Sequence, residues 1–261
     1  MFFTLADWAL ALVLAGVLAA ASLLGAIAGR RLRSRAASLR EPLGIVHGTV
    51  VGVVGLILAF ALTLAVGRYE NRRAAVVDDA NTIGTTYLRA QTLAEPERGA
   101  SLALLRRYAG LALQISHEVP NSAAMRDTAG RQAAVQRRLW RLAGRSLAAA
   151  PAASAPRLYV DSLNAMIDQQ TTRLSALNNR VPAAVLALEL VAAAIGLATL
   201  TLSTSVLGRG QVTSILAGVL VAALLLVTFD LDRPTRGLIR IPTGPLLALQ
   251  AAMAQPPAAS P

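Results

Sequence analysis

The sequence contains no cysteine, no lysine and only two histidines among its 261 residues. Without cysteine, the chain has no disulfide, thiolate metal site or cysteine nucleophile. His47 and His117 are too few and too isolated for a histidine-rich metal site. Aromatic residues form 4% of the chain, so its arginines lack the interleaved stacking rings that are typical of nucleic-acid binders. We therefore expect no metal, no cofactor and no nucleic-acid partner.

Enzyme signatures are also missing. There is no phosphate-cradling glycine loop of the Walker or dinucleotide type, no His-Glu-x-x-His and no Gly-x-Ser-x-Gly. Asp78 and Asp79 are adjacent, so on a helix their carboxylates point about 100° apart and do not share one site. A solvated helix face explains this pair. We expect no catalytic residue and no enzymatic activity.

Long apolar runs dominate the chain instead, and apolar residues make up 55% of it. Four runs reach the length of about 18 residues that spans ~30 Å of hydrocarbon, at residues 8–29, 43–67, 183–207 and 211–229. The leader MFFTLADW has no basic residue before the first run, unlike a secretory signal peptide. We therefore expect the first run to remain as a spanning helix.

The order of these runs predicts an all-α membrane protein with two spanning hairpins and a helical soluble insert. The expected parts are a first hairpin at 1–67, an insert at 68–181, a second hairpin at 182–232 and a C-terminal tail at 233–261. Apolar stripes predict a bundle of insert helices at 97–118, 123–149 and 158–180.

The second apolar run passes directly into charged sequence. The segment LILAFALTLAVGRYENRR, residues 56–73, contains no proline, and no turn signal follows Gly67. The next apolar residues recur at steps of 4, 3 and 4, as on one stripe of a helix: Val76, Ala80, Ile83 and Tyr87. We therefore expect the second spanning helix to continue unbroken out of the membrane to about residue 94.

Glycines recur at a spacing of four in both of the first two runs. They are Gly25 and Gly29 in the first, and Gly44, Gly48 and Gly52 in the second. Glycines so placed let another backbone approach closely. We expect the first pair to pack within one subunit, whereas the second set serves either that role, contact between subunits or a face open to water.

Arginine supplies all 25 basic residues, against 14 acidic ones, for a formal charge of +11. Such an excess is typical of anchoring to anionic lipid or of a field that gathers anions, and arginine is also common at membrane edges. Five arginines crowd the short loop after the first run: Arg30, Arg31, Arg33, Arg35 and Arg40. Because the positive-inside rule weights short loops, this crowding favours an insert outside the cell.

Three acidic residues near the spans are candidates for function. Glu189 lies about two turns into the third run, where a buried charge costs on the order of 2.5–3.5 kcal/mol at the bilayer centre. It pairs with an arginine, stays protonated or touches a water-filled path. Asp230 and Asp232 follow the fourth run in FDLDRP and are candidates for a cation site or a salt bridge, although carboxylates at helix ends are common.

Two segments resemble a known family. LILAFALTLAVGRYENRR resembles the end of the second helix of bestrophins, where an apolar stretch with a Thr-Leu pair runs into an arginine followed by aromatic residues. RYENRRAAVVDDANTIGTTYLRA, together with the late LDRPTRG, is similar to a bacterial membrane family of unknown function that is described as bestrophin-like. The close similarity covers about residues 50–115 and 228–240.

The resemblance implies a pentameric, chloride-type anion channel whose second helices surround a pore. Carried over by position, its hydrophobic neck would be Gly52, Leu56 and Phe60, with a glycine where the family has a bulky residue. The anion-attracting mouth would hold Arg68, Arg72 and Arg73. The acidic calcium-binding cluster of animal bestrophins is reduced here to Asp230 and Asp232, so activation by calcium is not expected.

The sequence thus supports two functions of different classes, and a third hypothesis, a lipid- or partner-binding assembly protein, shares with the second the lack of a pore. In the first, a homo-oligomer in the lipid of the bacterial inner membrane conducts small anions, and the resemblance places its insert and both termini in the cytoplasm. In the second, a non-conducting sensor or scaffold carries an extracytoplasmic helical ligand-binding domain. The side of the membrane that holds the insert distinguishes the two.

Overall fold

A computed structural model describes residues 7–208, 212–235 and 237–259. Residues 1–6 of the leader and Arg236 of the LDRPTRG segment lie outside this description, as does the side chain of Arg40. The regular elements within it are helices: α1 (Asp7–Leu32), the short 3-10 helix η2 (Arg33–Arg35), α2 (Ala36–Ala90), α3 (Glu97–His117), α4 (Ala123–Ala149), α5 (Ser154–Asn178), α6 (Ala183–Val206), α7 (Val212–Leu231) and α8 (Gly244–Ala254).

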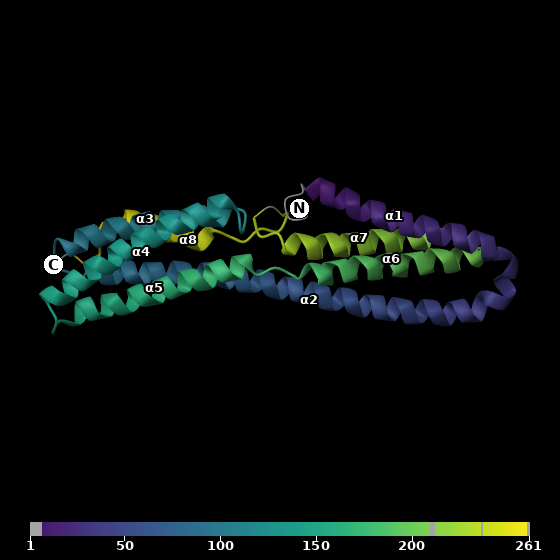
Figure 1. Ribbon diagram of the computed structural model, residues 1–261, viewed down its shortest axis with the longest axis horizontal. Coiled ribbons are helices and arrows are strands. Elements are labelled where there is room, and N and C mark those ends of the chain that lie inside the picture. Colours follow the sequence, from purple (N-terminus) through teal and green to yellow (C-terminus); the bar gives the residue numbers. More distant parts are fainter. Residues whose placement is uncertain (1–6, 209–211, 236, 260–261) are drawn as a thin grey trace. The chain divides into compact units, whose positions relative to one another are not determined.

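The chain divides into two compact units. The first, which we call the spanning unit, comprises Met1–Arg68 and Arg180–Ile239. The second, the bundle unit, comprises Tyr69–Asn179 and Arg240–Pro261. The spanning unit therefore holds α1, α6, α7 and the first part of α2, whereas α3, α4, α5, α8 and the rest of α2 belong to the bundle unit (Figure 1).

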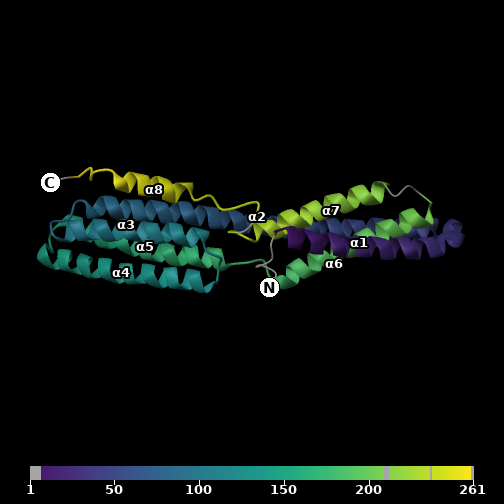
Figure 2. The same ribbon diagram turned by 90° about the horizontal axis from the view of Figure 1, so that it is seen from above.

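Four helical stretches in the described chain are long and apolar enough to cross a membrane. They contain the predicted runs 8–29 and 43–67, and they cover the runs 183–207 and 211–229 except for one residue of each. In the spanning unit, α1 packs along α6 and also contacts α7 (Figure 2). A Cβ atom on Gly25 would overlap the carbonyl oxygen of Ala198, and one on Gly29 would overlap that of Leu202. The prediction that this glycine pair packs within one subunit is confirmed.

Helix α2 continues past the end of its apolar run without a break, from Ala36 to Ala90. The helix ends four residues before the expected position 94. Its predicted stripe is buried in the bundle core, at exposed fractions between 0% and 6%: Val76, Ala80, Ile83 and Tyr87. Burial of this stripe explains why the helix persists where the sequence becomes polar.

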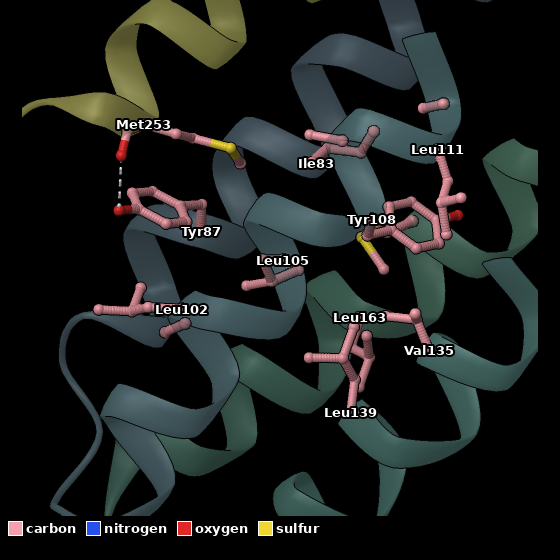
Figure 3. Close-up of a cluster of buried hydrophobic side chains, with 14 of the residues drawn as sticks. Ile83, Tyr87, Leu102, Leu105, Tyr108, Leu111, Val135, Leu139, Leu163 and Met253 are labelled. Atoms are coloured by element: carbon pink, nitrogen blue, oxygen red, sulfur yellow. Dashed lines mark hydrogen bonds between the residues drawn. The ribbon is translucent and has the colours of Figure 1, made fainter. Parts of the chain in front are cut away.

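The bundle core forms where α2, α3, α4 and α5 face one another. Leu105, Leu139 and Leu163 have no exposed surface and contribute to one continuous cluster (Figure 3). Helix α4 begins at the predicted residue because the Ser122 hydroxyl accepts a hydrogen bond from the Met125 N–H at 3.1 Å.

The segment expected as a C-terminal tail contains a docked helix, α8. Leu246 and Met253 of α8 are buried in the bundle core, and the Tyr87 hydroxyl donates a hydrogen bond to the Met253 carbonyl oxygen at 3.2 Å (Figure 3). Sequence periodicity did not identify α8 because 11 residues are too few to distinguish a docked helix from an apolar tail.

Candidate functional site

One face of α2 is largely exposed within the spanning unit. The exposed fractions of Leu56 and Phe60 are 56% and 66%. Gly52 is one turn before Leu56, and no atom lies within 4 Å of the place that a Cβ would take on it, nor on Gly44 or Gly48. The three residues expected to form the neck therefore share a face that lipid, water or another copy must cover.

The opposite face of α2 is the one that packs within the spanning unit. Leu58, Ala61 and Ala65 are buried, and Val54 lies against Gly196 of α6. This packing fixes the rotation of α2 about its own axis. Leu56 and Phe60 therefore project away from the chain's own core, although each is apolar and large.

The three arginines expected at the mouth have different environments. Arg72 is 1% exposed, and its guanidinium donates to the carbonyl oxygens of Ala176 at 3.3 Å and Asn179 at 2.7 Å. A cation at the C-terminal carbonyls of α5 also complements the dipole of that helix. Arg73 is exposed and lies 3.6 Å from Glu70, and Arg68 is half-buried. Arg72 thus holds α2 against α5 rather than facing solvent.

The expectation that Asp78 and Asp79 both lie on a solvated helix face is wrong for Asp79. Asp78 is exposed, but Asp79 has no exposed surface and accepts a hydrogen bond from Arg173 of α5. Arg173 also donates to the carbonyl oxygen of Ala112 at 2.9 Å and to the Ser116 hydroxyl. Burial raises the pKa of Asp79, and the charge and hydrogen bond of Arg173 oppose that rise.

Sequence reasoning missed this buried ion pair, although a signal for it exists. Asp79 is three residues after Val76 and four before Ile83, which places it on the predicted buried stripe. Arg173 in turn lies three residues after Gln170, which is also buried. An acid and a base on the inner stripes of two neighbouring helices are expected to pair, because an isolated buried charge is costly.

Glu189 is fully buried on α6, with Thr228 of α7 beside it. The Thr228 hydroxyl donates to the carbonyl oxygen of Leu224 at 3.0 Å. Among the ion pairs of the described residues, none includes Glu189. Pairing with an arginine, one of the three roles considered for this residue, is therefore not seen within the described chain.

Asp230 and Asp232 bind the backbone. The Asp230 carboxylate accepts from the N–H groups of Leu238 at 2.9 Å and Ile239 at 2.8 Å. A Cβ atom on Gly237 would overlap that carboxylate, which explains the glycine at the end of LDRPTRG. Asp232 accepts from the Val181 N–H at 3.0 Å. The two side chains thus hold the segments that follow α7 and precede α6.

Among the described residues, no three His, Asp or Glu side chains lie close enough together to hold a metal ion. The positive charge of Arg180 lies near Asp232. Of the two roles considered for the aspartates, a salt bridge is consistent with this charge beside Asp232, whereas the contacts of Asp230 are to backbone N–H groups.

Comparison with known proteins gives one family. The model of the bestrophin-like domain matches residues 15–246. A bacterial bestrophin homologue from Klebsiella pneumoniae has the same fold at 13% identity, with 91% of this chain and 94% of that chain covered and a TM-score of 0.63. A crystal structure described as a membrane protein matches at 13% identity, with 92% and 97% covered and a TM-score of 0.66. No curated protein matches the chain significantly.

Proposed function

The chain belongs to the bestrophin-like family, and from that premise we propose that it forms an oligomeric anion channel in the bacterial inner membrane. The observation that carries the proposal is the uncovered face of α2 with Gly52, Leu56 and Phe60. Several copies arranged about one axis, five by resemblance to bestrophins, would turn this face towards a shared path.

The spacing of the apolar side chains suits a neck. Leu56 and Phe60 are four residues apart, so their rings of side chains would lie about 6 Å apart along the axis. Two such rings form an apolar constriction, which gates ions by losing its water. Gly52 adds no side chain, so the path is expected to be wider at that level.

The charge of the insert suits anions. Between Arg68 and Arg180 the chain carries 16 arginines and 9 acidic residues, an excess of seven. Arg137, Arg138 and Arg141 of α4 are exposed and form no ion pair with another described residue. We propose that this excess, with Arg68 and Arg73, raises the local concentration of small anions such as chloride.

Currents across planar bilayers that contain the purified protein test this function. We expect a chloride current that increases in Leu56→Ala and Phe60→Ala, because smaller side chains weaken the apolar constriction. Val51→Ala is the matched control, since Val51 is also exposed but lies ~140° round α2 from Leu56. Absence of current in the wild-type protein and both neck variants would contradict the proposal.

The non-conducting sensor or scaffold remains the second candidate because the first-loop arginines favour an external insert. A cytoplasm-active reporter fused after Pro261, together with protease added to intact cells, tests the orientation. An active reporter and a protected segment between α4 and α5 support the channel. Cleavage between residues 150 and 153 from outside supports the sensor or scaffold.

A further inference from the structure

A groove of about 470 Å³ opens on the spanning unit where α1, α6 and α7 meet. Its floor includes Leu18 and Leu197, which are buried, and its rim includes Leu23, Ile215 and Val219, which are 61–63% exposed. The volume falls within the ~300–1,000 Å³ that is typical of small-ligand pockets. None of the neck residues lines this groove, so it is separate from the proposed conduction path.

The lining of the groove changes from apolar to polar along its length. Gly25 approaches Ala198 and Gly29 approaches Leu202, so α1 and α6 run in the same direction and Arg30 lies at the same end as Ser205. The Thr204 and Ser214 hydroxyls, 3.0 Å apart, place the first turn of α7 at that end too. The groove therefore has hydroxyls and a guanidinium at one end and aliphatic side chains at the other.

The length of the apolar part of the groove matches one leaflet of a bilayer. From Ala15 to Ala26, α1 rises ~16 Å at ~1.5 Å per residue, and Arg30 lies one turn further on. One leaflet supplies about half of the ~30 Å hydrocarbon core. A chain that fills the apolar part would thus place a headgroup near Arg30.

The polar end of the groove carries uncompensated positive charge. Arg30 is followed by Arg31, Arg33 and Arg35, and Glu41 is the first acidic residue after them in the sequence. These four arginines form no ion pair within the described chain. A cation cluster beside a hydrocarbon groove complements an amphiphile with an anionic headgroup.

We propose that this groove binds one acyl chain of an anionic phospholipid and that Arg30 binds its phosphate, with the Ser205 and Thr204 hydroxyls beside it. A free phosphate would not use the aliphatic walls, and an apolar helix of a second copy would not use the guanidinium. The proposal requires a bilayer but does not require conduction.

Native mass spectrometry of the full-length protein, released from nanodiscs that contain phosphatidylglycerol and phosphatidylcholine, tests the site. We expect wild-type protein to retain phosphatidylglycerol preferentially. Arg30→Gln should weaken that retention about fivefold, which corresponds to the ~1 kcal/mol of one cation at an anionic surface. Arg31→Gln is the matched control, because Arg31 is exposed but does not line the groove.

A second pair of variants tests the apolar part. Ala19 lines the groove and its neighbour Ala20 does not, and both are exposed. Ala19→Leu should reduce retention of both lipids, whereas Ala20→Leu should leave it unchanged.

Three results would overturn the proposal. If Arg30→Gln and Arg31→Gln lose phosphatidylglycerol to the same extent, the retention depends on general surface charge and not on the groove. Displacement of lipid by inorganic phosphate would indicate a free-anion site. A change of oligomer mass in Ala19→Leu, with lipid retention intact, would indicate that a second copy covers the groove.

Discussion

Replacing Arg173 by methionine is expected to destabilise the bundle unit strongly. Methionine keeps an unbranched side chain but removes the cation that donates to Asp79, Ala112 and Ser116. Arg173 and Asp79 are 2% and 0% exposed, so water cannot replace the lost partner without opening the bundle. The aspartate would be left buried without a counter-charge.

The expected magnitude follows from that burial. Breaking a buried ion pair by removing one partner costs about 3–5 kcal/mol. Replacing both partners by apolar residues of similar volume is often neutral or stabilising, because the cost of burying either charge disappears. We therefore expect Arg173→Met alone to be severe and the double variant Asp79→Leu/Arg173→Met to recover most of the stability.

Amide hydrogen exchange of the full-length protein in nanodiscs measures the effect. Peptides from the bundle part of α2 and from α5 should exchange at least about 100-fold faster in Arg173→Met, as expected for a loss of ~3 kcal/mol. Peptides from α6 serve as the internal control. Unchanged exchange in the single variant, or a double variant as unstable as the single one, would refute the reasoning.

Substitutions at three further contacts give additional tests. Gly25→Leu should lower the melting temperature in detergent, because the new side chain would overlap the Ala198 carbonyl oxygen. Gly16→Leu is the control and should leave the melting temperature unchanged, because no atom lies within 4 Å of the Cβ position of Gly16. Gly237→Ala should increase proteolysis after α7, since its Cβ would overlap the Asp230 carboxylate, and unchanged proteolysis would contradict that contact. The pKa of Glu95 is lowered below 4.5, first by the hydrogen bond from the Arg98 side chain and then by the one from the Gly99 N–H. The ionised Glu95 carboxylate therefore stabilises the folded protein above pH 4.5, and this stabilisation is lost as the pH falls through the lowered pKa. An NMR titration should show the Glu95 pKa below 4.5 in wild-type protein and closer to 4.5 in Arg98→Gln, and equal values would contradict this assignment.

The sequence predicts those parts of the fold that repeat a pattern over many residues. Apolar length identifies the spans because a bilayer requires about 18 consecutive residues, and this requirement is independent of tertiary contacts. The stripe from Val76 to Tyr87 identifies the continuation of α2 because a helix buries one face at a fixed period. Gly25 and Gly29 could be assigned to close packing for a related reason, since only glycine allows that approach between backbones.

Features that depend on one tertiary contact were not predictable. Arg72 has the sequence context of an exposed helix residue, and its burial depends on the end of α5, more than 100 residues later. The Asp230 carboxylate binds two backbone N–H groups that no side-chain pattern reveals. For the candidate site, the spacing of four residues places Gly52, Leu56 and Phe60 on one face of α2. Only the resemblance to bestrophins identifies that face as the expected neck.

Cysteine accessibility tests most directly whether this face of α2 borders water. The chain has no native cysteine, so Leu56→Cys and Phe60→Cys can each be probed without background. In bilayers, we predict that a membrane-impermeant anionic thiol reagent modifies both residues and blocks the chloride current. Leu220→Cys on α7, a position that is 71% exposed in the single chain, should not react because lipid covers it. If Leu56→Cys and Phe60→Cys are as inert as Leu220→Cys, the face of α2 lies against lipid or protein, and the proposed conduction path is wrong.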